Sequence, residues 1–125
     1  MNIRWTAVLT GFLADILLIF FISFFAPPTV SAGPDPTRAA DLILIGLDIL
    51  ATGVGGYIAG RMAQARRPLH GLLVGVVGIL AIQLQLLAGG PSLTRIDVVA
   101  LALGCLAGAL GGTLSRFPAA RRARW

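Results

Sequence analysis

The distribution of apolar residues along the chain predicts four membrane-spanning helices. An α-helix needs about 20 mostly apolar residues to cross the hydrocarbon core of a bilayer. Four stretches meet this requirement, over residues 5–26, 42–60, 69–88 and 98–115. None of them alternates as the strands of a barrel would, which leaves helices as the spanning structure. The sequence therefore predicts an all-α membrane protein, a four-transmembrane-helix bundle that forms one domain over residues 1–125.

Proline and glycine mark the breaks between these stretches. Pro27 and Pro28 end the first stretch. Pro68 lies in the break before the third stretch, and Pro91 lies just after the end of the third stretch. Proline cannot continue the hydrogen-bond ladder of a helix, so these positions are typical of loops.

Residues 30–32, with the sequence Val-Ser-Ala, also resemble the cleavage site of a secretory signal peptide. The apolar core of a signal peptide has about 7–15 residues. The first stretch is longer than that and contains Asp15. We therefore expect the first helix to stay in the membrane, with a mature protein that begins near Gly33 as the alternative.

The arginines predict one fixed orientation. Cytoplasmic loops of membrane proteins carry an excess of Arg and Lys. One side of the predicted topology has eight arginines and the other has two, Arg38 and Arg95, which lie near Asp35, Asp41 and Asp97. We expect the arginine-rich side to be cytoplasmic, with both termini there, in the inner membrane of a bacterial cell. The eight are Arg4, Arg61, Arg66, Arg67, Arg116, Arg121, Arg122 and Arg124.

The arginine clusters also predict contact with anionic lipid. Each basic residue near an anionic bilayer surface contributes about 1 kcal/mol of attraction. The residues expected to set topology and meet anionic headgroups are Arg61, Arg66, Arg67, Arg121, Arg122 and Arg124.

Composition supports a lipid environment and argues against nucleic acid as a partner. Hydrophobic residues make up 57% of the chain and charged residues 12%, whereas soluble domains have about 25% charged residues. The net charge of +5 could indicate nucleic-acid binding. The arginines, however, lie at the ends of apolar stretches, and no soluble domain is left to form a binding face.

The sequence contains signs of an internal repeat. Gly33-Pro34 with Thr37-Arg38 resembles Gly90-Pro91 with Thr94-Arg95, and both precede a spanning helix. Further identities align at a constant offset of 55 residues, and they predict two helical hairpins in the same orientation, related by a pseudo-two-fold axis along the membrane normal. The aligned residues are Gly53, Gly56, Arg61, Ala65, Arg66 and Arg67 with Gly108, Gly111, Arg116, Ala120, Arg121 and Arg122.

Glycines at steps of four predict close helix packing. This spacing puts them on one face of each helix, where the absence of side chains lets backbones approach. We expect a glycine zipper that packs the helices within the bundle, with a homo-oligomer or another membrane protein as the alternative partner. The residues are Gly56, Gly60, Gly71, Gly75, Gly104, Gly108 and Gly112.

Two aspartates inside the predicted spans form a candidate intramembrane site. A charged residue at the centre of a spanning helix costs about 2.5–3.5 kcal/mol on insertion scales, so such residues often mark a function. Helix rise puts Asp15, Asp48 and Gln83 at similar heights, roughly 16–21 Å from the cytoplasmic ends of their helices. One hypothesis is a proton- or cation-coupled site in which Gln83 is the hydrogen-bond partner of the aspartates. The other is that the carboxyl groups hold neighbouring helices together.

The remaining reactive side chains predict no enzyme, cofactor or metal site. His70 is the single histidine, and we expect it at the membrane interface. Cys105 is the single cysteine and lies within an apolar stretch, where a buried, inert thiol is expected.

Two short segments carry a family resemblance. Residues 55–61, Gly-Gly-Tyr-Ile-Ala-Gly-Arg, precede an arginine-rich turn, and residues 69–71, Leu-His-Gly, open the third helix. In these segments and in its layout the chain resembles the YrzE-like family of small four-span bacterial membrane proteins. That resemblance implies a four-helix membrane fold and brings no activity.

These observations favour a non-catalytic membrane protein that acts by helix association, with itself or within a larger membrane complex. The alternative is a small proton- or cation-coupled transporter or channel that uses Asp15 and Asp48.

Overall fold

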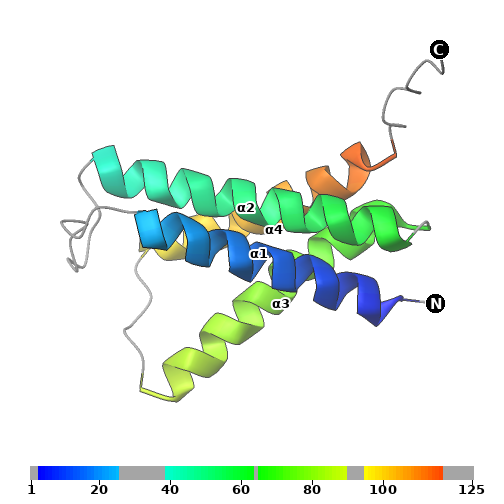
Figure 1. The fold of residues 1–125 in the computed structure, drawn as a ribbon. Coiled ribbons are helices and arrows are strands. Elements are labelled where there is room, and N and C mark those ends of the chain that lie inside the picture. The colour runs from blue at the N-terminus through cyan, green and yellow to red at the C-terminus, as the bar shows by residue number, and fades with distance from the viewer. Residues whose placement is uncertain (1–2, 26–38, 64, 90–94, 117–125) are drawn as a thin grey trace, which may run out of the picture.

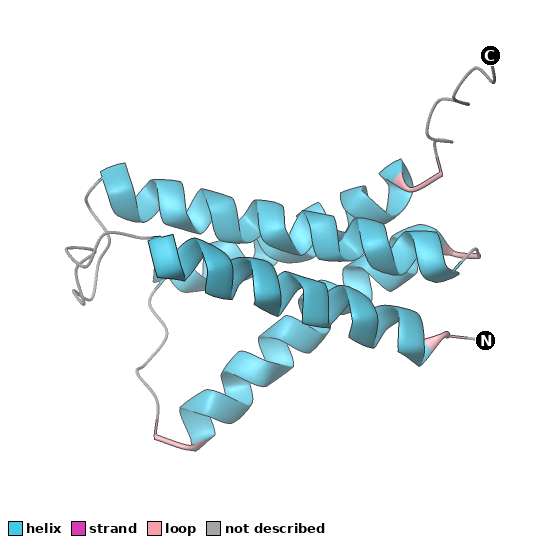
Figure 2. Cartoon of the chain, in the orientation of Figure 1, coloured by secondary structure: helices cyan, strands magenta, loops and turns pink. Residues whose placement is uncertain are grey.

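The computed structural model describes residues 3–25, 39–63, 65–89 and 95–116, and these contain four helices and no strand. The helices are α1 (Trp5–Phe25), α2 (Ala39–Ala63), α3 (Arg67–Leu87) and α4 (Arg95–Leu114) (Figures 1 and 2). Each contains a segment of 19 to 22 residues with a mean hydropathy of 1.6 to 2.4, long and apolar enough to cross a membrane. The predicted all-α fold is confirmed, and the four helices indicate a multi-pass membrane protein.

The helix boundaries lie within three residues of the predicted spans. α2 runs from residue 39 to 63 rather than 42 to 60, and α4 begins at Arg95 rather than at residue 98. Helices extend past the hydrocarbon core where polar residues reach the headgroup layer. Most of the repeated outer-loop pattern, at residues 33–38 and 90–94, lies outside the described residues.

A short turn joins α2 to α3. Arg66 has a φ of 48°, in the left-handed region that non-glycine residues seldom adopt. Its carbonyl oxygen accepts hydrogen bonds from the backbone N–H groups of Leu69 and His70, which opens α3. Pro68 follows in the first turn, where a helix has no use for its missing N–H group. The turn therefore fixes the direction in which α3 leaves α2.

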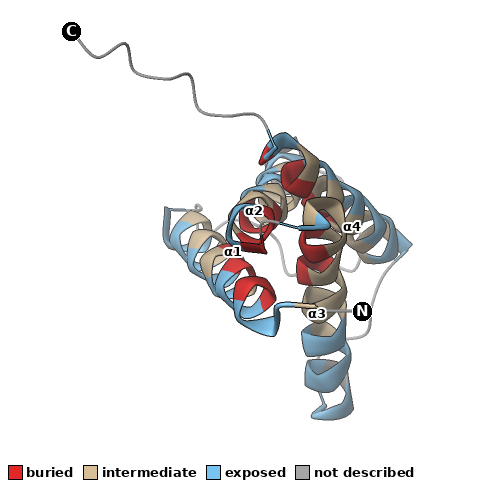
Figure 3. Ribbon diagram, turned by 90° about the vertical axis from the view of Figure 1, so that its right-hand side faces the viewer, coloured by how far each residue is buried: buried red, intermediate tan, exposed pale blue. Residues whose placement is uncertain are grey.

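α2 lies at the centre of the bundle and contacts the other three helices. α3 contacts all three as well, whereas α1 and α4 do not contact each other within the described part of the chain. α3 begins beside the other helices and then runs obliquely away from them (Figure 1). Its C-terminal half consequently projects from the bundle and is exposed (Figure 3).

Small residues fill the interior, and large apolar residues cover the outside. The buried apolar side chains are Ala7, Val8, Ala51, Ala59, Ala63 and Val74. Among the large residues on the outside, Phe20 is 70% exposed and Phe24 76%. Lipid tails are as apolar as these side chains, so membrane helices gain more from close packing of small residues than from burying large ones.

Candidate functional site

A buried carboxyl group lies between α1 and α2. Asp15 is only 4% exposed, and the hydroxyl oxygen of Thr52 lies 3.2 Å from its Oδ1 and 3.4 Å from its Oδ2. The same hydroxyl lies 3.2 Å from the backbone carbonyl oxygen of Asp48, one turn earlier on α2. Thr52 has a single hydroxyl hydrogen, so it donates to the Asp15 carboxylate or to the Asp48 carbonyl, but not fully to both.

These distances allow two hydrogen-bond arrangements. When Asp15 is ionised, Thr52 donates to the carboxylate. When Asp15 is a neutral acid, it donates to the Thr52 oxygen, and Thr52 then donates to the Asp48 carbonyl. Both arrangements tie α1 to α2, and the second leaves no charge on Asp15. The site can therefore bind a proton and also hold two helices together.

The side chain of Asp48 lies near this pair. It is half-buried on α2, one turn before Thr52, whose hydroxyl lies 3.2 Å from the Asp48 carbonyl oxygen and 3.2 Å from Oδ1 of Asp15. The structure thus brings Asp15 and Asp48 together. Thr52 was not among the candidate residues of the sequence, although it lies four residues after Asp48, on the same helix face.

Gln83 does not join the two aspartates, and the expectation of a shared polar layer that includes it is corrected. Its side chain is exposed on the outer half of α3. Val74 lies within 3.0 Å of the Cβ position of Gly11, so α3 is still inside the bundle at that level. Beyond it α3 diverges from the other helices (Figure 1), and Gln83 belongs to this exposed outer half. Thr52 occupies the partner position that was expected for Gln83.

Most of the predicted packing glycines lie where backbones meet. A Cβ on Gly56 would overlap the carbonyl oxygen of Gly108, and one on Gly71 would overlap the same atom. Gly60 approaches Gly112, Gly75 approaches the backbone of half-buried Cys105, and Gly112 approaches Arg67. Gly104 is buried but has only ordinary contacts with Thr52.

The sequence did not indicate a second close approach, between α1 and α2. A Cβ on Gly11 would lie 2.5 Å from the carbonyl oxygen of Gly55, and one on Gly55 would lie 2.6 Å from that of Gly11. Gly11 has no glycine neighbour at a step of four, so no motif marks it.

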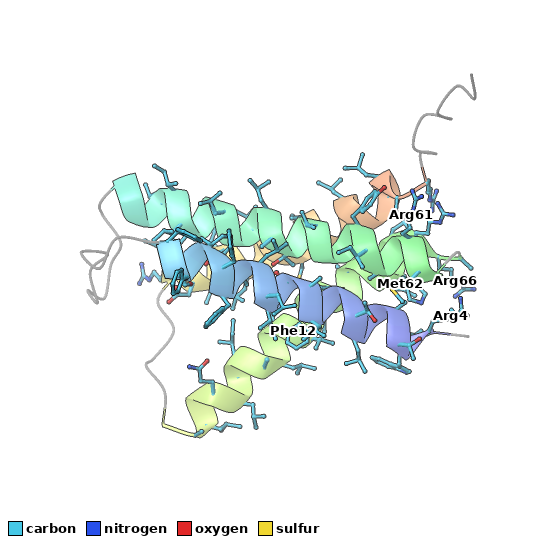
Figure 4. The ribbon with its side chains drawn as sticks, in the orientation of Figure 1. Arg4, Phe12, Arg61, Met62 and Arg66 are labelled. Atoms are coloured by element: carbon cyan, nitrogen blue, oxygen red, sulfur yellow. The ribbon has the colours of Figure 1, made fainter. Side chains whose placement is uncertain are left out.

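Arg4, Arg61 and Arg66 lie at one end of the bundle, where α2 ends and α1 and α3 begin (Figure 4), whereas Arg95 starts α4. Arg61 and Arg66 are exposed, whereas Arg67 is half-buried and donates a 2.6 Å hydrogen bond to the carbonyl oxygen of Ser115. Arg4 donates in the same way to the carbonyl oxygen of Met62, at 3.2 Å. Each of these two arginines thus satisfies a carbonyl at the C-terminal end of another helix. Arg121, Arg122 and Arg124 lie outside the described residues.

His70 lies at this same end, in the first turn of α3, and is buried there against the start of α1. It is 1% exposed, and its Nε2 accepts a 3.1 Å hydrogen bond from the backbone N–H of Arg4. Its Nδ1 lies 3.1 Å from the carbonyl oxygen of Arg66, an atom that can only accept. The ring is therefore the neutral tautomer with hydrogen on Nδ1, and it joins the start of α1 to the turn before α3.

Comparison with known proteins gives one family match. No curated protein and no solved structure matches this chain. Among the described residues, no three of His, Cys, Asp and Glu are grouped as a metal site. The family described as protein of unknown function (DUF3792) matches residues 4–115, nearly the whole sequence. The chain therefore belongs to this family.

Proposed function

We propose that this protein is a non-catalytic component of a bacterial inner membrane that acts by associating with other membrane helices, in a second copy of itself or in a larger complex. The observation that carries this proposal is the course of α3. Its outer half leaves the bundle and exposes large apolar side chains, with Leu84 69% and Leu87 86% exposed. The polar groups inside the bundle, in contrast, bond to one another and hold its helices together.

The position of the arginines supports an orientation with both termini in the cytoplasm. Arg4, Arg61 and Arg66 lie at the same end of the bundle (Figure 4). Arg and Lys are enriched on the cytoplasmic side of membrane proteins. We also propose that exposed Arg61 and Arg66 meet anionic headgroups, and that the family match corresponds to the YrzE-like group.

Two pairs of contacts support the proposed duplication of a helical hairpin. Gly56 meets Gly108, and Gly53 meets Gly111. At the offset of 55 residues, Gly53 corresponds to Gly108 and Gly56 to Gly111, so each contact maps onto the other. The arginine contacts are also alike, because the start of α1 bonds to the end of α2 and the start of α3 to the end of α4. These are the contacts that a local two-fold axis between α2 and α4 would produce.

A photocrosslinking amino acid at residue 84 tests the proposed association in native membranes. We expect it to give protein adducts, whose partner mass spectrometry identifies as this chain or as another membrane protein. Leu17 on α1 is 59% exposed and provides the control position, where lipid adducts should dominate. Protein adducts at equal yield from both positions, or at neither, would contradict the proposal.

A second candidate function rests on the carboxyl groups. Asp15 is buried beside Asp48 with a hydroxyl that can exchange its hydrogen bond, which is the chemistry of a proton- or cation-coupled transporter or channel. Intramembrane carboxyl groups of this kind mark transport pathways in many membrane proteins.

The double replacement Asp15→Asn with Asp48→Asn separates the two readings. Asparagine keeps the size of the side chain and its hydrogen bonds but cannot ionise. If the aspartates form a coupled site, the variant should keep its assembly and lose proton- or cation-driven flux in liposomes. If they only hold helices together, the wild-type protein should show no such flux.

A further inference from the structure

We propose that Gln83 lies at the centre of a homodimer interface formed by the outer half of α3. This inference rests on the proposed association and names its partner, a second copy of the chain. Gln83 is exposed on the surface of the bundle. Its distance from Arg67 along the helix is 16 residues, or about 24 Å, which is less than the roughly 30 Å of hydrocarbon. The oblique course of α3 keeps Gln83 deeper still (Figure 1).

An amide at this depth has a strong requirement for a partner. It has two N–H groups and a carbonyl oxygen, and lipid tails offer none of them a hydrogen bond. Amide side chains in spanning helices therefore associate with polar groups of other helices. Within the described part of the chain, the side-chain amide of Gln83 bonds to no other residue. Its partner must accordingly come from outside the bundle.

The residues around Gln83 form a face suited to helix packing. Leu80 and Leu87 stand three residues before Gln83 and four after it, which puts them on its side of α3. Leu84 follows Gln83 directly, about 100° round the helix, at the edge of this face. Leu80, Leu84 and Leu87 are 62%, 69% and 86% exposed. A polar residue within such an apolar seam fixes register and partner in paired helices.

A second copy of the same chain is the partner that this face fits. The arginines orient every copy alike, so two α3 helices meet in parallel about a two-fold axis along the membrane normal. A residue near such an axis meets its own counterpart. An amide is both donor and acceptor, so two Gln83 side chains can bond to each other, as two carboxylates or two guanidinium groups cannot.

Gln85 offers a matched control on the same helix. It is also exposed, but two residues turn the helix by about 200°, which puts it on the opposite side from Gln83. The test compares Gln83→Leu with Gln85→Leu by energy transfer between donor- and acceptor-labelled copies of the full chain. The label is on an N-terminal tag, and the liposomes contain phosphatidylcholine with phosphatidylglycerol. Serial dilution with lipid gives the dimer dissociation constant.

We expect Gln83→Leu to raise this constant about three- to fifteenfold, the range for interhelical hydrogen bonds in membranes. Gln85→Leu should change it less than twofold, and Gln83→Asn should restore most of the affinity. If the wild type dimerises and neither leucine variant changes the dissociation constant, the proposed interface at Gln83 is wrong, although the chain does self-associate. If the wild type stays monomeric at every dilution, the inference is wrong, and the crosslinks from residue 84 decide the proposed function separately.

Discussion

Replacement of Gly56 by alanine is expected to force α2 and α4 apart and to lower the free energy of unfolding by about 2–3 kcal/mol, the upper part of the range for overpacked interiors. A Cβ on Gly56 would lie 2.7 Å from the Cα of Gly108 and 2.8 Å from its carbonyl carbon. These are backbone atoms of a helix, so they cannot move aside unless α4 moves. Lipid provides little drive to bring separated helices back together, so the lost contact would not be recovered.

Unfolding in mixed micelles with increasing SDS, followed by tryptophan fluorescence, measures this effect. Gly46 on the same helix is the matched control, because no atom lies within 4 Å of its Cβ position. Gly46→Ala should leave stability unchanged or raise it by about 0.5–1 kcal/mol, since alanine is the better helix former. Equal losses in the two variants would contradict the assignment of the effect to the contact between Gly56 and Gly108.

Replacement of His70 by alanine is the second change with a large expected effect, about 2–4 kcal/mol of unfolding free energy. The imidazole is one of the largest fully buried side chains, so its removal leaves a cavity. It also leaves the N–H of Arg4 without its acceptor. The carbonyl of Arg66 is less affected, because it keeps the backbone N–H groups of Leu69 and His70 itself.

Two amide substitutions separate the contributions of the two ring nitrogens. His70→Gln can retain the acceptor that faces Arg4, whereas His70→Asn can retain the donor that faces Arg66. The same SDS titration should rank glutamine closest to wild type, asparagine next and alanine lowest. An alanine variant as stable as wild type would contradict the assignment of His70 as a link between α1 and α3.

The four helices could be predicted because their causes are local. The length of an apolar stretch decides whether it can cross the bilayer as a helix, and proline decides where that helix ends. For this reason residues 5–26 were nearly right as a prediction for Trp5–Phe25. The identity of Asp15 as the key polar residue was predictable for the same reason, since a lone charge in an apolar run is visible in the sequence alone.

The direction of α3 could not be predicted from the sequence. Helix rise gave the position of Gln83 along the axis of α3. That position does not say how far α3 diverges from the other helices. That divergence follows from the turn at Arg66 and from how closely Gly71 meets Gly108. Both depend on tertiary contacts, so Gln83 was assigned to the interior and lies outside.

The role of Thr52 and the burial of His70 were missed for a related reason. A threonine in a spanning helix usually bonds to its own backbone, and a histidine at a helix end usually lies at the interface. Only the neighbouring helices distinguish these cases. Thr52 faces Asp15 because α1 and α2 approach at Gly11 and Gly55, one turn away.

The separation of α1 from α4 restricts how the first and last helices can communicate. In the described part of the chain their backbones do not approach each other, so an influence between them would travel through α2 or α3. Thr52 provides a short route, because its hydroxyl bonds to Asp15 while its side chain borders Gly104 and Gly108. A proton gained or lost at Asp15 would reorient this hydroxyl beside α4. Thr52 is thus a residue through which the protonation of the first helix could be felt by the last.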